Sequence, residues 1–257
     1  MSTVVVDQSG WGKLRVTGED RERFLQGMVT NDLAGMAVGS FRRAAILSVK
    51  GRVLAVVDIV AEEGSYLVLT EPVTARKVAE VLDRHAIADD VAFEPVELPC
   101  HRVWDSIEAV WSAPPAFAPA PAPSPDGEIE IRRVEAGFPR YGVDVGEDYF
   151  PFEANLDRLI SYTKGCYAGQ EVVARASARG HANKRLVGLR LASPVAAGAR
   201  LAAAARPEAG TVTSSVVSPD FGPIALAYVH RSVWAPGTEL RAGDVVATVT
   251  ELPFGAG

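Results

Sequence analysis

The chain opens with a short alternating segment followed by a segment of helical period. Residues 13–16 (KLRV) alternate polar and apolar positions, which indicates a strand. The apolar positions of residues 24–28 (FLQGM) then recur at helical spacing. Thr17, with Asp20 three residues later, has the pattern of a capping box, so we expect Thr17 to cap this helix.

A second region, from residue 40 to residue 96, predicts a small α+β unit. Its predicted strands cover residues 41–49, 52–60, 66–69 and 91–96. The first two are joined by a turn at Lys50-Gly51. A helix is predicted after Pro72, because proline at the start of a helix gives up no hydrogen bond.

The rest of the chain predicts further strands, interrupted by a proline-rich insertion. Residues 112–127 (SAPPAFAPAPAPSPDG) consist largely of proline and alanine, so we expect a surface loop or semi-rigid spacer without chemistry. Residues 128–134 alternate in the manner of a strand. After residue 184, short apolar runs are separated by glycine and proline, which is typical of a small β-barrel or sandwich.

The charge and the N-terminus exclude several classes of function. A formal net charge of −6 argues against general nucleic-acid binding, which depends on neutralising phosphates with Lys and Arg. The first ten residues contain no basic residue and no long apolar core, so they predict no secretory signal. The most apolar stretch, residues 53–61, is too short to span a bilayer and contains Asp58. We therefore expect a cytoplasmic protein that binds neither nucleic acid nor membrane.

The cysteines and histidines predict no metal centre. The chain has two cysteines, Cys100 and Cys166, which is too few for a disulfide framework or for an iron–sulfur cluster held by one chain. Its four histidines show no metal-ligand spacing.

Six segments carry a resemblance to a known family. Residues 164–175 read KGCYAGQEVVAR, residues 24–32 read FLQGMVTND, residues 50–52 read KGR and residues 135–145 read EAGFPRYGVDV. Nearer the C-terminus, residues 210–219 read GTVTSSVVSP and residues 224–230 read IALAYVH. Together they resemble the YgfZ family of folate-binding proteins, which is related to the glycine cleavage T-protein, an aminomethyltransferase. The resemblance covers nearly the whole chain apart from the Pro/Ala insertion and an alanine-rich stretch near residue 202.

The resemblance implies an α+β fold made of three domains in a cloverleaf around a central opening. It places a discontinuous folate-binding domain at residues 1–43 and 101–181. A ferredoxin-like α+β domain is expected at residues 44–100, and a β-barrel domain at residues 182–257. The residue pattern by itself agrees with the α+β middle and the β-rich end.

The resemblance also implies the cofactor and the partners. The cofactor is tetrahydrofolate or another reduced folate. The function is support of the assembly or repair of iron–sulfur enzymes, with the client or assembly proteins as partners. Whether the protein performs chemistry on the folate stays open. Two alternatives are a folate-dependent one-carbon transferase of the aminomethyltransferase type and a module that only stores or senses folate.

Four residues in the matching segments are candidates for the folate pocket. Folate has a flat pteridine with N–H donors and an anionic glutamate tail, so its site needs a carboxylate, apolar walls and a cation. By the resemblance, Glu135 is the carboxylate that binds the pteridine, and Lys164 meets the tail as an exposed cation. Tyr141 and Asp144 shape the pocket, although Tyr141 fits the core equally well.

Four other residues complete the candidates. Asn31 fits either a ligand contact or a plain helix-end turn. Gln170 and Arg175 belong to the matching segment, yet the polar face of any helix would also produce them. Cys166 is the candidate catalytic residue, because Lys164 lies two residues away and a nearby cation favours the thiolate. The alternative for Cys166 is a small buried apolar residue.

The strand after the Lys50-Gly51 turn predicts the absence of one activity. Aminomethyltransferases of the wider family carry an acidic pair there, whereas this chain has the apolar Ala55 and Val56. Asp58 is on the same strand face as Val56 but two residues further along. We therefore expect no detectable aminomethyl cleavage in a reconstituted assay with a lipoyl carrier protein. Robust turnover would contradict this and support the transferase alternative.

Overall fold

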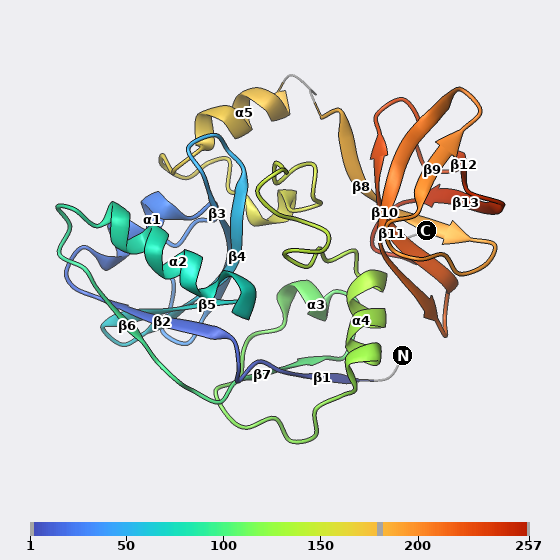
Figure 1. The fold of residues 1–257 in the computed structure, drawn as a ribbon. Coiled ribbons are helices and arrows are strands. Elements are labelled where there is room, and N and C mark those ends of the chain that lie inside the picture. The colour runs from blue at the N-terminus through green and yellow to red at the C-terminus, as the bar shows by residue number, and fades with distance from the viewer. Residues whose placement is uncertain (1–2, 179–181, 256–257) are drawn as a thin grey trace.

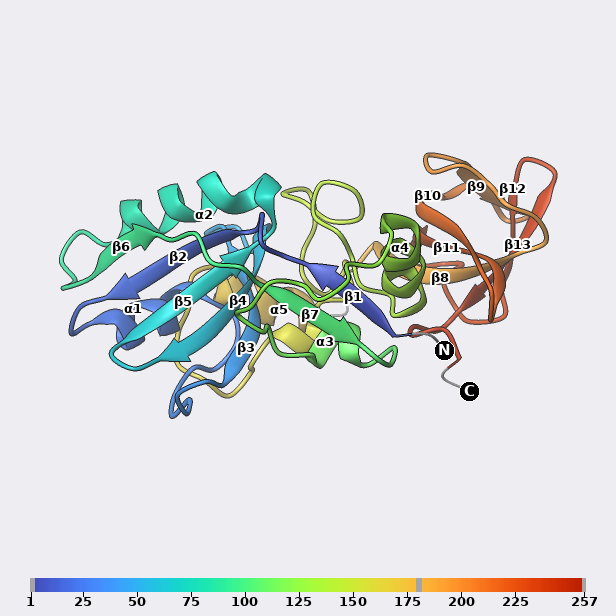
Figure 2. The same ribbon diagram turned by 90° about the horizontal axis from the view of Figure 1, so that it is seen from below.

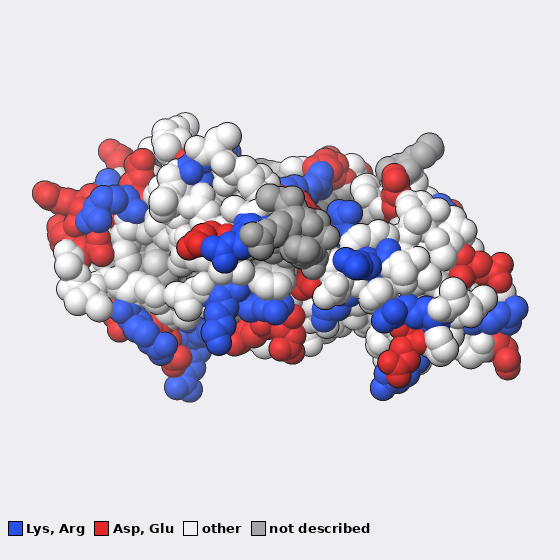
Figure 3. Space-filling model, turned by 90° about the horizontal axis from the view of Figure 1, so that it is seen from above, with Lys and Arg blue, Asp and Glu red and all other residues white. Residues whose placement is uncertain are grey.

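The computed structural model describes residues 3–178 and 182–255 (Figure 1). A mixed α+β part and a β-barrel lie at opposite ends of the molecule, and short helices, loops and a two-stranded ribbon connect them. No helix in the described ranges has the length and apolar character needed to cross a membrane. On the face shown in Figure 3, acidic and basic side chains are interspersed among uncharged ones.

The mixed part is a five-stranded antiparallel sheet with two helices on one face. The strand order is β3-β4-β5-β2-β6, with β2 Gly12–Thr17, β3 Phe41–Leu47, β4 Val53–Glu62, β5 Ser65–Thr70 and β6 Ala92–Pro95. Helices α1 (Arg21–Met28) and α2 (Pro72–His85) pack against this sheet in a single apolar core. The strands, both helices and the buried stripe of α1 are thus confirmed.

The start of α1 differs from the prediction. The helix begins at Arg21 with Asp20 as its N-cap residue, and no side chain caps it. Thr17 instead ends β2, where it pairs with Ala92 of β6. The strand takes precedence over the cap because its backbone groups are already used in the sheet.

Strand pairing also crosses one expected domain boundary. β2 lies between β5 and β6 in the sheet, although residues 12–17 were expected in the first domain and residues 44–100 in the second. The boundary expected between residues 43 and 44 falls within β3. The boundary expected at residue 181 lies outside the described residues.

The C-terminal part is a closed barrel, as expected. Its strands follow the order β10-β11-β8-β13-β12-β9, and β10 pairs with β9 to close the cylinder. Their bounds are β8 Lys184–Leu191, β9 Arg200–Ala203, β10 Arg206–Ser218, β11 Gly222–His230, β12 Glu239–Ala242 and β13 Val245–Thr250. The inward-facing side chains form a separate apolar core.

The connecting part contains one helix where a strand was predicted. Helix α4 (Asp126–Glu135) includes residues 128–134, and it packs against β10 and β11 of the barrel on one side and against β1 on the other. Its buried residues are Arg132, Arg133, Val134 and Glu135. Because three of these four are charged, the buried face carries no apolar helical period. The alternation of Glu and Ile at residues 128–131 therefore predicted a strand where the chain forms a helix.

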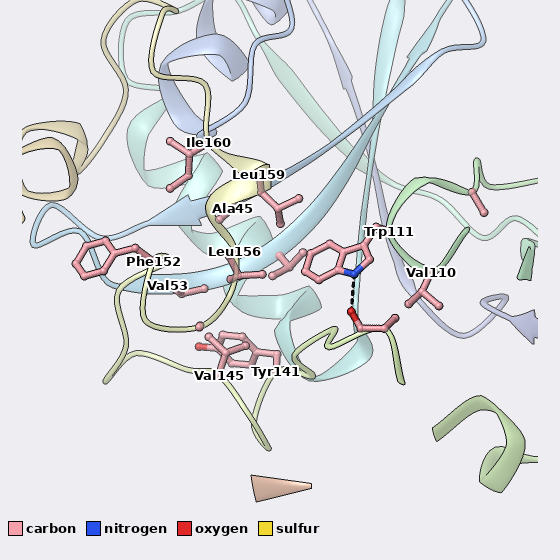
Figure 4. Close-up of a cluster of buried hydrophobic side chains, with 14 of the residues drawn as sticks. Ala45, Val53, Val110, Trp111, Tyr141, Val145, Phe152, Leu156, Leu159 and Ile160 are labelled. Carbon is pink, nitrogen blue, oxygen red and sulfur yellow. Dashed lines mark hydrogen bonds between the residues drawn. The ribbon is translucent and has the colours of Figure 1, made fainter. Parts of the chain in front are cut away.

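The remaining elements of this part are short. β1 (Val4–Asp7) and β7 (His101–Trp104) form an antiparallel ribbon that bridges the sheet and the barrel (Figure 2). The others are α3 Ala109–Ser112, the 3₁₀ helix η1 Asp157–Leu159 and α5 Gln170–Ala178. The long loops between them are held by a core that includes Trp111, whose Nε1 donates to the carbonyl oxygen of Ala136 at 2.9 Å (Figure 4).

The Pro/Ala loop is tied to both edges of this ribbon. Ala116 forms a β-bridge with His101 of β7, and the His101 Nδ1 lies 2.9 Å from the carbonyl oxygen of Ala118. On the other edge, the backbone N–H of Ser124 donates to the carbonyl oxygen of Val5 at 2.9 Å. The loop therefore follows the ribbon closely rather than hanging free.

A buried ion-pair triad joins the sheet to the ribbon. The Asp58 carboxylate in β4 accepts from Arg43 Nε of β3 at 2.8 Å and from Arg102 Nη2 of β7 at 2.7 Å. All three side chains are buried. Burial alone would raise the pKa of Asp58, but Arg102 and Arg43 outweigh it and hold the pKa below its ordinary value.

Replacing Asp58 with Ala should lower the free energy of unfolding by about 3–5 kcal/mol, because it leaves two buried guanidinium groups without their carboxylate. Urea denaturation at neutral pH would measure this. The Asp58 contribution is present above the unfolded pKa of about 3.9 and is lost as the pH falls from there through the folded pKa. Glu80→Ala, which removes an exposed pair with Arg76, is the control and should change stability little. Equal losses in the two variants would contradict the assignment.

Candidate functional site

A cavity of about 240 Å³ lies where the ribbon, α4 and the first turn of α2 meet. Its walls are largely apolar and aromatic. They include Trp11, Trp104, Val110, Ile129 and Phe138. Charged side chains also line it, namely Asp7, Arg43, Glu71, Asp126, Glu130, Arg133 and Arg140. Flat apolar surfaces with charged groups between them suit a planar heteroaromatic ligand.

One side of the cavity carries a network of paired charges. Arg133 of α4 binds both carboxylate oxygens of Glu130, at 2.6 and 2.9 Å, and donates to Asp144 Oδ2 at 2.7 Å. Arg140 Nη1 lies 3.2 Å from Glu130 Oε2. Burial alone would raise the pKa of Glu130, but the hydrogen bonds from Arg133 outweigh it and lower the pKa. Glu130 is thus ionised, and its carboxylate oxygens are already bound by Arg133 and Arg140.

A second carboxylate of the cavity, that of Glu71, has no such partner. Glu71 is the N-cap residue of α2, yet its side chain does not cap the helix. Its Oε1 accepts from the backbone N–H of Tyr141 at 3.5 Å. Within residues 3–178 and 182–255 no side chain forms an ion pair with it, although Arg133, Arg140 and Arg43 act on its charge from further away. Burial raises the pKa of Glu71. This carboxylate is available to a ligand with N–H donors.

The structure does not bring Glu135 to this cavity. Glu135 is the last residue of α4, and only 1% of its surface is exposed. Its Oε1 accepts from Ser218 Oγ of β10 at 2.6 Å. It lines a different, smaller pocket of about 160 Å³ together with Pro219 and Asp220 at the barrel. A helix end that faces the barrel cannot also present this carboxylate to the central cavity.

Tyr141 and Asp144 lie beside the cavity, and each is held by other groups. Asp144 is completely buried, and its carboxylate accepts hydrogen bonds from Arg133, from the Arg140 backbone N–H and from the hydroxyl groups of Thr213 and Ser214 in the barrel. Tyr141 belongs to the core, with its hydroxyl 3.0 Å from Lys77 Nζ. Neither lines the cavity, but each contacts a residue that does: Asp144 accepts from Arg133, and the backbone N–H of Tyr141 donates to Glu71.

Lys164 is a buried residue, which corrects the expectation of an exposed cation. Its Nζ donates to the carbonyl oxygens of Gln26, Val29 and Asn31, at 2.7, 2.8 and 2.8 Å. These carbonyls lie at the C-terminal end of α1 and just after it, where a cation is favourable. Burial lowers the pKa of Lys164 to about 8. All three donors of the ammonium are therefore used inside the protein.

Asn31, Gln170 and Arg175 do not line the cavity either. The Asn31 side chain donates to the carbonyl oxygen of Arg43 at 2.8 Å and accepts from the backbone N–H of Asp32 at 2.9 Å, as in a helix-end turn. Gln170 begins α5, and Arg175 is exposed on the same helix in an ion pair with Glu171.

Cys166 is exposed, in contrast to the completely buried Cys100. It lies between two anchored residues, Lys164 and Ala168, whose backbone N–H donates to the carbonyl oxygen of Gly27 at 3.0 Å. Next to this loop, Gly169 (φ +80°) packs on the β3–β4 turn, where an added Cβ would lie 2.5 Å from the carbonyl oxygen of Ser48. The thiol is thus presented at the surface on a fixed loop, away from the cavity residues.

Sequence reasoning missed most of the cavity. Trp11, Glu71, Trp104 and Glu130 come from four separate segments, and no motif connects them. Of the cavity residues, Phe138 and Arg140 lie in the matching segment EAGFPRYGVDV. The one local signal for Glu71 was its place directly before the proline that begins α2.

Comparisons with known proteins identify the architecture. The GCVT N-terminal domain model matches residues 1–102, and the model of the glycine cleavage T-protein C-terminal barrel domain matches residues 184–254. The crystal structure of the glycine cleavage system aminomethyltransferase T from Bartonella henselae aligns with a TM-score of 0.82 over 98% of this chain and 86% of that chain. At 19% identity, this likeness concerns the fold.

Two curated relatives differ in how much of them the chain covers. The aminomethyltransferase of Saccharopolyspora erythraea is 40% identical over 130 residues, which are 48% of this chain and 35% of that protein. The tRNA-modifying protein YgfZ of Sodalis glossinidius is 29% identical over 228 residues, which cover 70% of this chain and 69% of that protein. The chain therefore spans about a third of the length of the first relative.

The fold and the two matching domain models define a protein of T-protein architecture, with an α+β part, a connecting part and a C-terminal barrel. The α+β fold expected from the resemblance is thereby confirmed. The chain belongs to the glycine cleavage T-protein family. Its sequence is also similar to YgfZ proteins, at 27–29% identity.

Thiol labelling of the native protein should modify Cys166 and leave Cys100 unreacted, because only Cys166 is exposed. Mass spectrometry after a short incubation with iodoacetamide would locate the label. Cys166→Ser should then show no labelling until denaturant is added. Rapid labelling of Cys100 in the native state would contradict the described packing.

Proposed function

We propose that this protein binds a reduced folate, such as tetrahydrofolate, in the central cavity. The observation that carries the proposal is the Glu71 carboxylate, which faces the cavity between aromatic walls and has no ion-pair partner in the described part of the chain. The pteridine of folate carries adjacent N–H donors on one edge. A carboxylate can accept both of these hydrogen bonds, and such charge-assisted bonds are among the strongest in proteins.

The dimensions of the cavity favour the ring end of the ligand. Pockets that enclose drug-sized ligands have volumes of roughly 300–1,000 Å³, and this cavity has about 240 Å³. The bicyclic pteridine would lie inside, and the aryl and glutamate parts would extend outward. Arg140, whose side chain is 46% exposed, lines the same cavity and can meet the anionic tail. In this proposal Arg140 takes the role that the sequence suggested for Lys164.

The buried core of β4 does not support aminomethyl cleavage. Ala55 and Val56 are both buried and apolar, and the nearest acid on the strand, Asp58, is held by Arg43 and Arg102. A carboxylate locked between two guanidinium groups has a lowered pKa and cannot act as an acid near neutral pH. Burial raises the pKa of Glu71, whereas the pKa values of Asp7 and Glu130 in the same cavity are lowered, and we assign Glu71 to binding.

We further propose that the folate-bound protein supports the assembly or repair of iron–sulfur enzymes. The YgfZ-type sequence and the exposed position of Cys166 on an anchored loop support this proposal. An exposed thiol outside the cavity can reach a protein partner. A deletion strain assayed for several iron–sulfur enzymes, complemented with the parent gene or with Cys166→Ala, would test it. Full complementation by Cys166→Ala would remove the cysteine from the proposal.

Glu71→Gln should weaken tetrahydrofolate binding by at least tenfold. A neutral amide loses the charge and one of the two acceptor oxygens, and hydrogen bonds to charged groups contribute about 1.5–3 kcal/mol. Isothermal titration calorimetry would measure the change. Glu80→Gln, an exposed carboxylate on the same helix, is the matched control and should bind like the parent.

Two results would count against this assignment. Binding that survives Glu71→Gln but is lost in Glu135→Gln would place the pteridine carboxylate at Glu135, as the resemblance suggested. A parent protein that does not bind any reduced folate would remove the proposed function itself.

A further inference from the structure

A second buried lysine, Lys13, holds a loop in the cavity wall. Lys13 lies in β2 with 5% of its surface exposed. Its Nζ donates to three backbone carbonyl oxygens, those of Gln8 at 3.0 Å, Ser9 at 2.9 Å and Trp11 at 3.1 Å. An ammonium has three donors and no acceptor, so this arrangement uses all of them. No carboxylate of the described residues forms an ion pair with it.

The three carbonyls come from one tight loop and converge on one point. Their negative ends repel each other unless a positive charge lies between them. The Lys13 ammonium occupies that position, in the way that a bound monovalent cation would. Other hydrogen bonds also hold the loop: the backbone N–H of Trp11 donates to the carbonyl oxygen of Gln8 at 3.0 Å, that of Ser9 donates to Asp7 Oδ1 at 2.8 Å, and that of Gln8 donates to the carbonyl oxygen of Cys100 at 2.8 Å. The Gln8 side chain accepts from Arg102 Nε at 2.9 Å. The Lys13 ammonium contacts three of the loop's carbonyl oxygens at once.

This loop also lies beside the Glu71 carboxylate in the cavity wall. Gln8, Trp11 and Glu71 all line the cavity, and Gly12 pairs with Thr70 of β5, so Trp11 and Glu71 are neighbours at the ends of adjacent strands. Gly12, next to Trp11, packs directly on α2, and a Cβ added there would lie 2.4 Å from Ala75 Cβ. The path of the backbone through the loop therefore decides where the Trp11 ring lies relative to the Glu71 carboxylate.

We propose that Lys13 is a positioning residue for the ligand cavity: its ammonium acts as a built-in cation that holds the carbonyl groups of Gln8, Ser9 and Trp11 together and thereby fixes the Trp11 ring beside Glu71. The identity of the ligand rests on the proposed function. The role of Lys13 in ordering the loop rests on the contacts alone. Lys13 itself does not touch the ligand.

Lys13→Ala tests the proposal, because it removes three methylene groups and the ammonium. Propylammonium has the same atoms as the part removed, and 1-propanol is its uncharged counterpart. We expect Lys13→Ala to bind tetrahydrofolate at least tenfold more weakly and to exchange the amide hydrogens of residues 8–12 faster. We expect millimolar propylammonium, but not 1-propanol, to reverse both changes in the variant and to leave the parent protein unaffected.

Leu82→Ala is the control for general loss of stability. Leu82 lies on the buried face of α2, is completely buried and does not line the cavity. It should lower the melting temperature while leaving tetrahydrofolate affinity and amide exchange at residues 8–12 unchanged, measured well below that temperature. If Lys13→Ala does not yield folded protein, Lys13→Met, which keeps most of the side-chain volume without the charge, is measured in the same way against Leu82→Ala.

Three results would overturn the proposal. They are unchanged affinity and exchange in the Lys13 variant, the same changes in Leu82→Ala, and equal rescue by propylammonium and 1-propanol. If the parent protein does not bind tetrahydrofolate, the proposed function fails, and the exchange of residues 8–12 with and without propylammonium still decides whether Lys13 orders the loop.

Discussion

The architecture depends on buried carboxylates that each bind groups from distant parts of the chain. Asp58 joins β4 to β3 through Arg43 and to β7 through Arg102, so one side chain ties the sheet to the ribbon. Asp144 does the same between α4, its own loop and β10 of the barrel. The cavity lies between these two centres. A carboxylate removed from water is stable only when several donors reach it together, which makes the relative placement of the parts specific.

The sequence predicted the regular parts of the fold because there the apolar period reports burial directly. The strands of the sheet, the helices α1 and α2 and the barrel strands were all visible in this way. The strand predicted at residues 128–134, where the structure has helix α4, was wrong for a physical reason. Its buried face consists mostly of Arg132, Arg133 and Glu135, which are buried because they bind acids, a base and hydroxyl groups of other segments. A hydrophobic pattern cannot report burial of that kind.

The candidate site was harder to predict from the sequence than the fold was. The motif KGCYAGQE predicted the family correctly, but the structure places its lysine in the protein interior and its cysteine at the surface. Residue type suggests an exposed lysine, and only the converging carbonyls at the end of α1 explain the burial of Lys164. The residues that line the cavity are far apart in the chain, so their proximity follows from the sheet order and the ribbon rather than from any local pattern.

The Pro/Ala loop has a consequence for behaviour in concentrated solution. A two-stranded ribbon has two open edges, and open edges allow strands of other molecules to add on and begin aggregation. Here Ser124 pairs with Val5 on one edge, and Ala116 pairs with His101 on the other. The five prolines that lie between residues 113 and 124 have no backbone N–H to offer a further strand. The Pro/Ala loop thus covers both edges of the ribbon, which disfavours the addition of a strand from another molecule at either edge.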